Sequence, residues 1–279
     1  MINKMITIKE LGFSYHETKE HVLKNITMTL EEGRIYGLLG ENGVGKTTLL
    51  TLICGLKKPK EGTISIDGND PYMRKPSLLS EIYYLSDEVA AANMKATDYA
   101  ATYGKFWDNF DMARFLEIME VFETEADKKM NRMSAGQLKK THIAFALACG
   151  TKYLLMDEPT NGLDIPSKAQ FRKAVMKYTR EDATIVISTH QVRDLENIID
   201  PIIILDRQDV LLNASIEDIC SRLYFDYSNE MHPEALYCEM IPGGSIQVLI
   251  NTTGEDSKIN IEALFNTVHR HKELIKTTF

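Results

Sequence analysis

The stretch RIYGLLGENGVGKTTLLTLICGL, residues 34–56, joins an apolar run to a helix-forming run through a glycine-rich turn. The apolar run shows little alternation, which is typical of a strand covered on both faces of a sheet. The turn fits the pattern G-x-x-x-x-G-K-S/T, in which glycines let the backbone wrap closely around phosphate groups. The helix that follows points its free N–H groups at the same anion. The stretch therefore predicts a strand–loop–helix unit that holds a triphosphate.

The residues of the turn have expected parts in this phosphate cradle. Lys46 reaches the β and γ phosphates, and the Thr47 hydroxyl holds Mg²⁺. A flexible glycine loop is the alternative interpretation, and the position between a strand and a helix counts against it. The predicted phosphate-binding residues are Gly40, Glu41, Asn42, Gly43, Val44, Gly45, Lys46, Thr47 and Thr48.

Two later stretches supply candidate catalytic groups. YLLMDEP, residues 153–159, ends an apolar strand with Asp157, which completes the Mg²⁺ shell, and Glu158, which polarises the attacking water. ISTHQ, residues 187–191, places His190 at the end of the next strand. The carboxyl end of a parallel strand faces the ligand crevice, so we expect His190 to contact the γ phosphate. An acidic turn and a structural histidine are the alternatives.

The chain around these motifs indicates an α/β fold with a second, antiparallel layer. Alternating apolar residues predict strands over residues 5–15 and 62–68, and residues 22–33 predict another. Apolar runs at residues 152–159 and 183–190 flank a helical stretch, which implies a parallel sheet.

The segment from about Asp87 to Met133 is helical in character. Its sequence FDMARFLEIMEVF carries an apolar stripe at helical spacing, which we expect to pack on neighbouring elements. The stripe consists of Met112, Phe115, Leu116, Met119 and Phe122.

The end of the chain, residues 219–279, predicts a small α+β appendage. ALYCEMIPGGSIQVLI predicts a hairpin that turns at residues 242–244. NIEALFNTVHRHKELIK then places four apolar residues on one helical face. That face consists of Ile261, Leu264, Phe265 and Val268.

Charge, cysteine spacing and the length of the apolar runs exclude some classes of protein. The 279 residues carry a net charge of −8, which argues against a general nucleic-acid binder because phosphate contacts need clustered cations. The four cysteines lack metal-ligand spacing, so reduced thiols are expected. The first ten residues show no apolar signal-peptide run, and no apolar run approaches the roughly 20 residues that span a bilayer. We therefore expect any link to a membrane to pass through a partner.

The order of the motifs resembles the nucleotide-binding subunit of ABC transporters. From Met5 to Asp218, the cradle is followed by MSAGQ, MDEP, NGLD and STH. The resemblance implies that Tyr15 stacks on adenine and that Asp164 communicates across a dimer. It also implies that the signature residues Ser134, Gly136 and Gln137 contact the γ phosphate of ATP held by a second subunit. Ser134 and Gln137 alone predict a helix cap, and a plain cap is the alternative.

The resemblance implies an architecture and partners as well. The expected fold is a P-loop NTPase, RecA-like core at residues 1–218 with a mainly parallel sheet, an antiparallel layer and a helical subdomain at about 88–140. The expected activity is ATP hydrolysis with Mg²⁺ in a head-to-tail dimer with an identical or related ATP-binding subunit. The expected partner is a separately encoded membrane permease of exporter type. The chain would then be cytoplasmic and peripheral at the inner face of the cell membrane.

Some positions depart from the family pattern. Met133 and Ala135 stand where Leu and Gly are usual, and Asp87 replaces a glutamine linked to Mg²⁺. Asp87 can still bind Mg²⁺ or its water, but it adds charge and no donor. Two alternatives to a transporter ATPase stay open. One is a soluble ABC-type ATPase of an assembly system, such as iron–sulfur assembly, and the other is a regulator that binds ATP with little hydrolysis.

Overall fold

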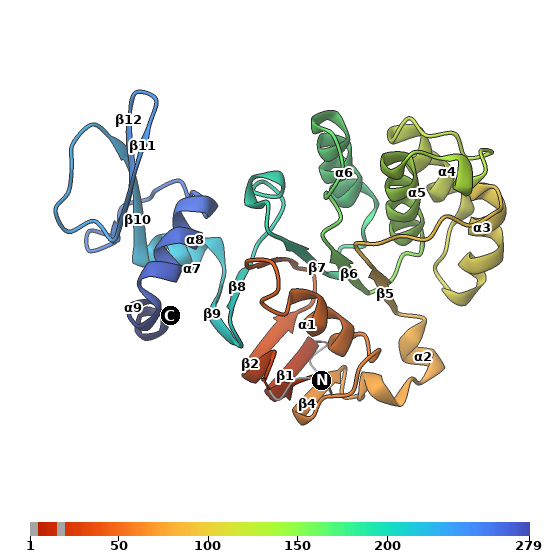
Figure 1. Cartoon of the computed structure of the whole chain (residues 1–279), viewed down its shortest axis with the longest axis horizontal. Helices are drawn as coiled ribbons and strands as arrows, with labels where there is room; N and C mark the ends of the chain where they lie inside the picture. Colours follow the sequence, from red (N-terminus) through yellow and green to blue (C-terminus); the bar gives the residue numbers. More distant parts are fainter. Residues whose placement is uncertain (1–4, 16–19) are drawn as a thin grey trace.

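The computed structural model describes residues 5–15 and 20–279, and its centre is a six-stranded sheet (Figure 1). The strand order is β5-β6-β7-β3-β8-β9. Strand β9 runs antiparallel to β8, and the other neighbouring pairs are parallel. The strands are β3 (Ile35–Leu39), β5 (Ile82–Leu85), β6 (Tyr153–Asp157), β7 (Thr184–Thr189), β8 (Ile202–Asp206) and β9 (Asp209–Ala214). The mainly parallel sheet expected from the apolar runs is confirmed.

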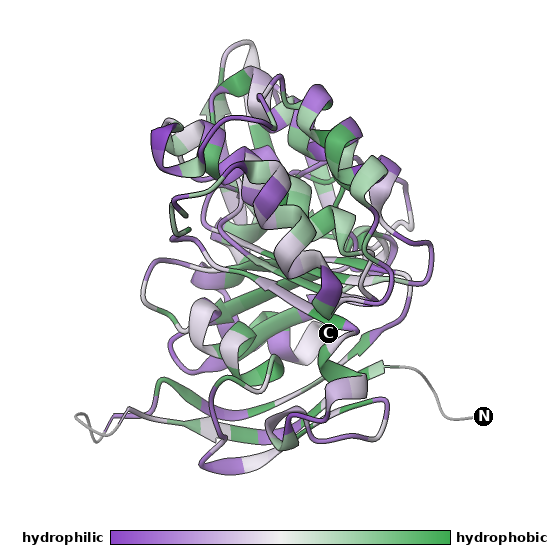
Figure 2. Ribbon diagram, turned by 90° about the vertical axis from the view of Figure 1, so that its right-hand side faces the viewer, coloured by the Kyte–Doolittle hydropathy of each residue, from purple (hydrophilic) through white to green (hydrophobic). Residues whose placement is uncertain are grey.

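The central strands are apolar on both faces because each face packs against a different layer. In β6, Leu154 and Met156 belong to one apolar cluster, which also contains residues of α5 (Ala135–Ala148) and α6 (Ile165–Tyr178). Leu155 points the other way, into a second cluster with α1 (Lys46–Ile53). Figure 2 shows this apolar colouring in the strands that cross the middle of the molecule.

The antiparallel layer has the order β2-β1-β4 and lies beside α1 (Figure 1). Its strands are β1 (Met5–Phe13), β2 (Leu23–Glu31) and β4 (Glu61–Ile66), as the alternating pattern predicts. Side chains such as Ile6, Ile26 and Ile64 are buried in the same cluster as α1. This layer therefore shares its core with the glycine loop that precedes α1.

The segment between β4 and β6 is mostly helical. After β5, Phe115, Met119 and Phe122 are buried as predicted, but Leu116 is 39% exposed. Ile118 takes the fourth buried place, because a 100° helical step puts it on the same face as Phe115 and Phe122 while Leu116 turns away. The helices are η1 (Pro71–Met73), α2 (Pro76–Leu79), α3 (Ala96–Tyr103), η2 (Gly104–Phe106), α4 (Met112–Val121) and η3 (Met130–Arg132).

The C-terminal segment forms a three-stranded sheet with helices against it, and lies at one end of the molecule (Figure 1). The predicted hairpin is present between β11 and β12, while β10, on the other side of β12, was not anticipated. Its elements are α7 (Ile216–Arg222), β10 (Leu223–Ser228), β11 (Tyr237–Ile241), β12 (Gly244–Ile250), α8 (Ile261–Arg270) and α9 (Lys272–Thr278), while the short helix η4 (Val192–Asp194) lies between β7 and β8.

The predicted helical face lies within α8, and the backbone then leaves helical geometry at His271 (φ −123°, ψ 45°), so that the end of the quoted stretch forms the separate helix α9. Ile261, Leu264 and Val268 are buried as predicted, and Phe265 is half-buried. The appendage boundary that we propose, after residue 218, falls inside α7. Within the described residues, no helix has the length and apolar character needed to cross a membrane.

Candidate nucleotide-binding site

The glycine loop leaves β3 and is closed by its own lysine. Lys46 Nζ donates to the carbonyl oxygens of Gly40 (2.7 Å) and Glu41 (3.1 Å). Gly43 and Gly45 have φ of +84° and +110°, a region that side chains disfavour. These two glycines allow the loop to curl around the lysine. The backbone N–H groups at the start of α1 then face the space where the predicted phosphates would lie.

The predicted metal ligands lie next to each other. Thr47 Oγ1 donates to Asp157 Oδ2 at 2.6 Å, although the two residues are 110 positions apart. Ser188 Oγ donates to the other Asp157 oxygen at 2.5 Å, and the Tyr84 hydroxyl donates to Oδ2 at 3.4 Å. Burial, with the Asp157 carboxylate as the next cause, raises the pKa of Tyr84. Tyr84 therefore stays a neutral donor that orients Asp157.

Glu158 is held in an unusual backbone conformation between two cationic or polar partners. Its φ is +44°, in the left-handed region, and its N–H donates to the carbonyl oxygen (3.2 Å) and Oγ (3.0 Å) of Ser188. One carboxylate oxygen, Oε2, lies 2.9 Å from His190 Nδ1. The other, Oε1, is buried and lies 3.3 Å from Lys46 Nζ without hydrogen-bond geometry to it. Oε1 therefore keeps a lone pair available for a further donor.

Tyr15 lies at the mouth of the loop. Its hydroxyl shares a hydrogen bond with Thr48 Oγ1 at 2.9 Å, and its ring meets Phe13 edge-on at 5.2 Å. The Lys57 ammonium lies 5.1 Å from the ring centroid. With 41% of its surface exposed, Tyr15 retains a ring face on which a base can stack.

These groups line one cavity of about 360 Å³. The structure thus brings together, around one space, residues that the sequence assigned to it from several separate motifs. The cavity is lined by Tyr15, Val22, Asn42, Gly43, Gly45, Lys46, Thr47, Thr48, Asp87, Asp157 and Glu158. An adjoining cavity is lined by Glu41 and Val44 together with Arg207 and Gln208.

The signature residues lie elsewhere. Ser134 caps α5: its Oγ accepts from the Gln137 N–H (3.2 Å), and the Gln137 side chain accepts from the Ser134 N–H (3.2 Å). Within the described chain, neither these residues nor Gly136 line the cavity above. Asp164, exposed, caps α6 by accepting from the Ser167 N–H at 3.0 Å. The capping box predicted from the sequence is confirmed, and it lies outside the lining of this chain's own phosphate space.

Sequence reasoning missed several residues of the site. Ser188 lies within the quoted ISTHQ motif and could have been found there, because it is two residues before His190. Tyr84 and Lys139 had no motif to mark them. Lys139 Nζ donates to Asp87 Oδ1 (3.1 Å) and to the Asp87 carbonyl oxygen (2.6 Å), and Asn161 Nδ2 lies 3.4 Å from each Asp87 carboxylate oxygen.

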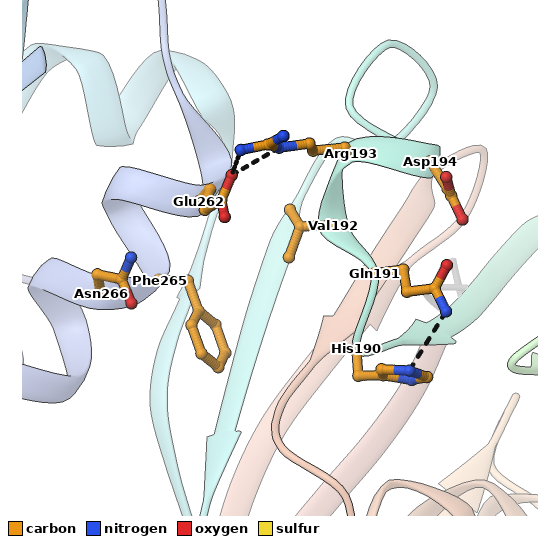
Figure 3. A pocket seen from close by; sticks show the side chains of 8 residues that line it. All are labelled: His190, Gln191, Val192, Arg193, Asp194, Glu262, Phe265 and Asn266. Atoms are coloured by element: carbon orange, nitrogen blue, oxygen red, sulfur yellow. Dashed lines mark hydrogen bonds and ion pairs between the residues drawn. The ribbon is translucent and has the colours of Figure 1, made fainter. Parts of the chain in front are cut away.

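A second cavity of about 460 Å³ lies between residues 190–194, which include His190, and α8 of the appendage (Figure 3). Arg193 closes it at one side with two contacts to Glu262 Oε2, at 2.7 Å from Nε and 2.5 Å from Nη2. Phe265 projects into the space from α8, as Figure 3 shows. The appendage therefore contacts the segment that carries His190.

Strand β3, its glycine loop, Lys46 and the carboxylate after β6 define the class: this is a P-loop nucleotide-binding core. The comparisons specify the class further. Residues 23–161 match the family model described as ABC transporter. The chain is therefore a member of the ABC transporter family and carries its ATP-binding cassette.

Individual relatives agree with this assignment. The ABC transporter ATP-binding protein NatA of Bacillus subtilis (strain 168) is 29% identical over 224 residues, covering 77% of this chain and 91% of that protein. The methionine import ATP-binding protein MetN 1 of Oceanobacillus iheyensis is 29% identical, covering 78% and 68%. The dimeric bacterial cassette MJ0796 superposes with a TM-score of 0.66 at 25% identity, covering 76% of this chain and 98% of that one.

Proposed function

We propose that this chain hydrolyses Mg²⁺–ATP in a dimer of cassettes and thereby powers a separate membrane subunit that exports a substrate. The observation that carries the proposal is the convergence of Lys46, Thr47, Asp157 and Glu158 on one cavity. Lys46 is the one cation among the described residues that line this cavity, and it is placed to exchange its carbonyl partners for phosphate oxygens.

The residues fit a magnesium ion. Mg²⁺ prefers hard oxygen donors and keeps several ligands from water and phosphate. The Thr47 hydroxyl and the Asp157 carboxylate, 2.6 Å apart, are the groups that would hold it. When bound, the metal neutralises charge on the β and γ phosphate oxygens.

Glu158 is the group that would accept the proton of the attacking water. Its buried Oε1 has an unused lone pair, while Oε2 is fixed by His190. A general base must lie within hydrogen-bond reach of the proton it takes, and a fixed carboxylate satisfies this condition without reorganisation. His190, held by the same carboxylate, lines the cavity toward α8 and not the nucleotide cavity, and its contact with the γ phosphate remains our proposal.

A second cassette would complete the site. The α5 N-terminus exposes N–H groups that Ser134 satisfies only in part, and such groups favour an anion. The residues that carry them do not line the chain's own cavity, so the γ phosphate of a partner's ATP is the anion we propose. The relative MJ0796 forms a dimer and has also been solved in a post-hydrolysis state with ADP and Pi.

An apolar groove supports a membrane subunit as the further partner. A cavity of about 410 Å³ beside β5 is lined by Leu56, Leu79, Phe106 and Trp107, among others, and Phe106 is 68% exposed. Large exposed apolar side chains grouped in one place mark interaction sites. Tyr84, which contacts Asp157, also lines the groove, so a partner seated there would adjoin the nucleotide cavity.

Export is the direction we propose, because the short helical segment between β5 and α5 is similar to that of bacterial exporter-type family members. The names of relatives differ: LnrL of Bacillus subtilis, 28% identical over 212 residues, is a linearmycin resistance ATP-binding protein, and MetN 1 is a methionine import ATP-binding protein. The proposed location is the cytoplasmic face of the membrane, through the partner.

The test is a pull-down of the tagged chain from membranes, combined with an ATPase assay. We expect a multi-span membrane protein to co-purify and Phe106→Glu to abolish its recovery while ATP binding persists. Met240→Glu, at an equally exposed apolar position on β11, is the matched control and should change nothing. Recovery of a soluble assembly complex instead would favour the assembly-type ATPase. Absence of Mg²⁺-dependent ATPase in the complex would favour the regulator.

A further inference from the structure

Lys139 is a buried lysine that has no role in the ATPase reaction proposed above. Its side chain, on α5, is 6% exposed. A buried ammonium group is costly unless charged or polar partners satisfy it. The partners that the structure gives it belong to one residue, Asp87, through the carboxylate oxygen Oδ1 at 3.1 Å and the carbonyl oxygen at 2.6 Å. Lys139 and Asp87 therefore act as one unit, joining α5 to the loop after β5.

The other side of Asp87 faces the nucleotide cavity. Asp87 lines the same cavity as Thr47 and Asp157, and its side chain is 40% exposed. Asn161 Nδ2, at 3.4 Å from both carboxylate oxygens, restrains it from a third direction. The carboxylate thus has an ammonium group behind it and the phosphate space in front.

Charge in the cavity explains why this arrangement matters. The lining includes the carboxylates of Asp87, Asp157 and Glu158 but, among the described residues, a single cation, Lys46. A triphosphate entering this space meets an excess of negative charge. Lys46 pairs with Glu158. Lys139 supplies a second ammonium group from outside the lining, directly against Asp87.

We propose that Lys139 is a positioning residue for the ATPase reaction. It neutralises Asp87 and fixes its carboxylate, so that one oxygen remains directed at the water shell of the nucleotide's metal ion without repelling the phosphates. Since Lys139 lies on the helix that Ser134 begins, the same pair ties the nucleotide cavity to the signature helix. This inference rests on the proposed binding of Mg²⁺–ATP in the cavity.

The test measures nucleotide affinity in a non-hydrolysing Glu158→Gln background, with a fluorescent ATP analogue, in Mg²⁺ and in EDTA. We expect Lys139→Gln to weaken Mg²⁺–ATP binding about tenfold, because Asp87 is left uncompensated. The double variant Asp87→Asn/Lys139→Gln should recover the affinity to within about threefold of the parent, because the repelling charge is gone. Lys139→Arg, which keeps the charge, should bind like the parent.

Lys140→Gln is the matched control: it removes the same charge one position further along α5 and should leave the affinity unchanged. If Lys139→Gln lowers the Tm without changing nucleotide affinity, or if Asp87→Asn fails to restore binding, Lys139 only packs the helix and the proposal is overturned. Should Lys139→Gln not fold, Asp87→Ala decides: a several-fold smaller affinity gain from Mg²⁺ supports the proposal, and an unchanged gain overturns it. Failure of the parent to bind Mg²⁺–ATP would count against the proposed function itself.

Discussion

The substitution Ser134→Arg separates the two roles of the α5 N-terminus. As a cap, Ser134 makes one hydrogen bond, from the Gln137 N–H at 3.2 Å. Losing an N-cap costs about 1 kcal/mol, and a cation at the positive end of a helix costs about 0.3–1 kcal/mol more. Ser134 is exposed, so the longer side chain meets no clash in the monomer. We expect the free energy of unfolding to fall by about 1–2 kcal/mol, which leaves the chain folded.

The catalytic effect should be far larger than this cost. A donor supplied in trans to a γ phosphate contributes about 10³–10⁵ in rate, so turnover should become undetectable against background. Affinity of the isolated cassette for ATP should not change, because the signature residues lie outside its own cavity. Thermal unfolding, equilibrium binding of a fluorescent nucleotide and phosphate release measure the three quantities on the same preparation. Weakened nucleotide binding by the monomer, or turnover near the parent rate, would show that Ser134 is only a cap.

Four further perturbations have defined outcomes. Glu158→Gln should slow phosphate release by about 10²–10⁴ while ATP still binds, and gel filtration in Mg²⁺–ATP should show a longer-lived dimer; a parent-like rate would remove Glu158 from its assigned role. Tyr15→Ala should weaken ATP binding about 5–150-fold through loss of stacking, seen by calorimetry, whereas unchanged affinity would place the adenine elsewhere. Phe115→Ala, fully buried on α4, should lower the free energy of unfolding by about 3–5 kcal/mol in urea titrations, and a smaller loss would mean that the site collapses. Burial lowers the pKa of His142 below its ordinary 6.5, so unfolding takes up a proton in that range. The stability that depends on neutral His142 is complete above pH 6.5 and is lost as the pH falls through the folded-state pKa; the Tm of a His142→Gln variant should therefore respond less to acidification, and an equal response would assign the effect to other groups.

Local motifs predicted the central strands and the cradle because their physics is local. The glycine loop, Lys46 and Thr47 are contiguous, and the strand before them is uniformly apolar. The cap at Ser134 needs only a partner three residues away. Such features depend on spacing within a single element, which the sequence displays directly.

Features that depend on tertiary neighbours could not be predicted in the same way. The pair of Lys139 and Asp87 joins residues 52 positions apart, and no periodicity marks it. The exposure of Leu116 depends on how α4 is rotated against its neighbours. The apolar stripe alone therefore predicted Leu116 as buried, where the structure buries Ile118. The extra strand β10 was not predicted because residues 229–243 separate it from its pairing partner β12, so that no tight turn marks the pair.

The continuity of the apolar interior sets a practical limit on dividing this chain. Leu223, Phe225 and Val248 of the terminal sheet belong to the same buried cluster as Ile202 and Ile204 of the cassette. Lys272 and Lys276 add ion pairs to Asp206 and Asp209 at the edge of the main sheet. Cutting the chain after residue 218 would expose to water apolar residues of the cassette that are now buried. Replacing the tail with that of another family member would therefore require matching changes in the cassette residues that contact it.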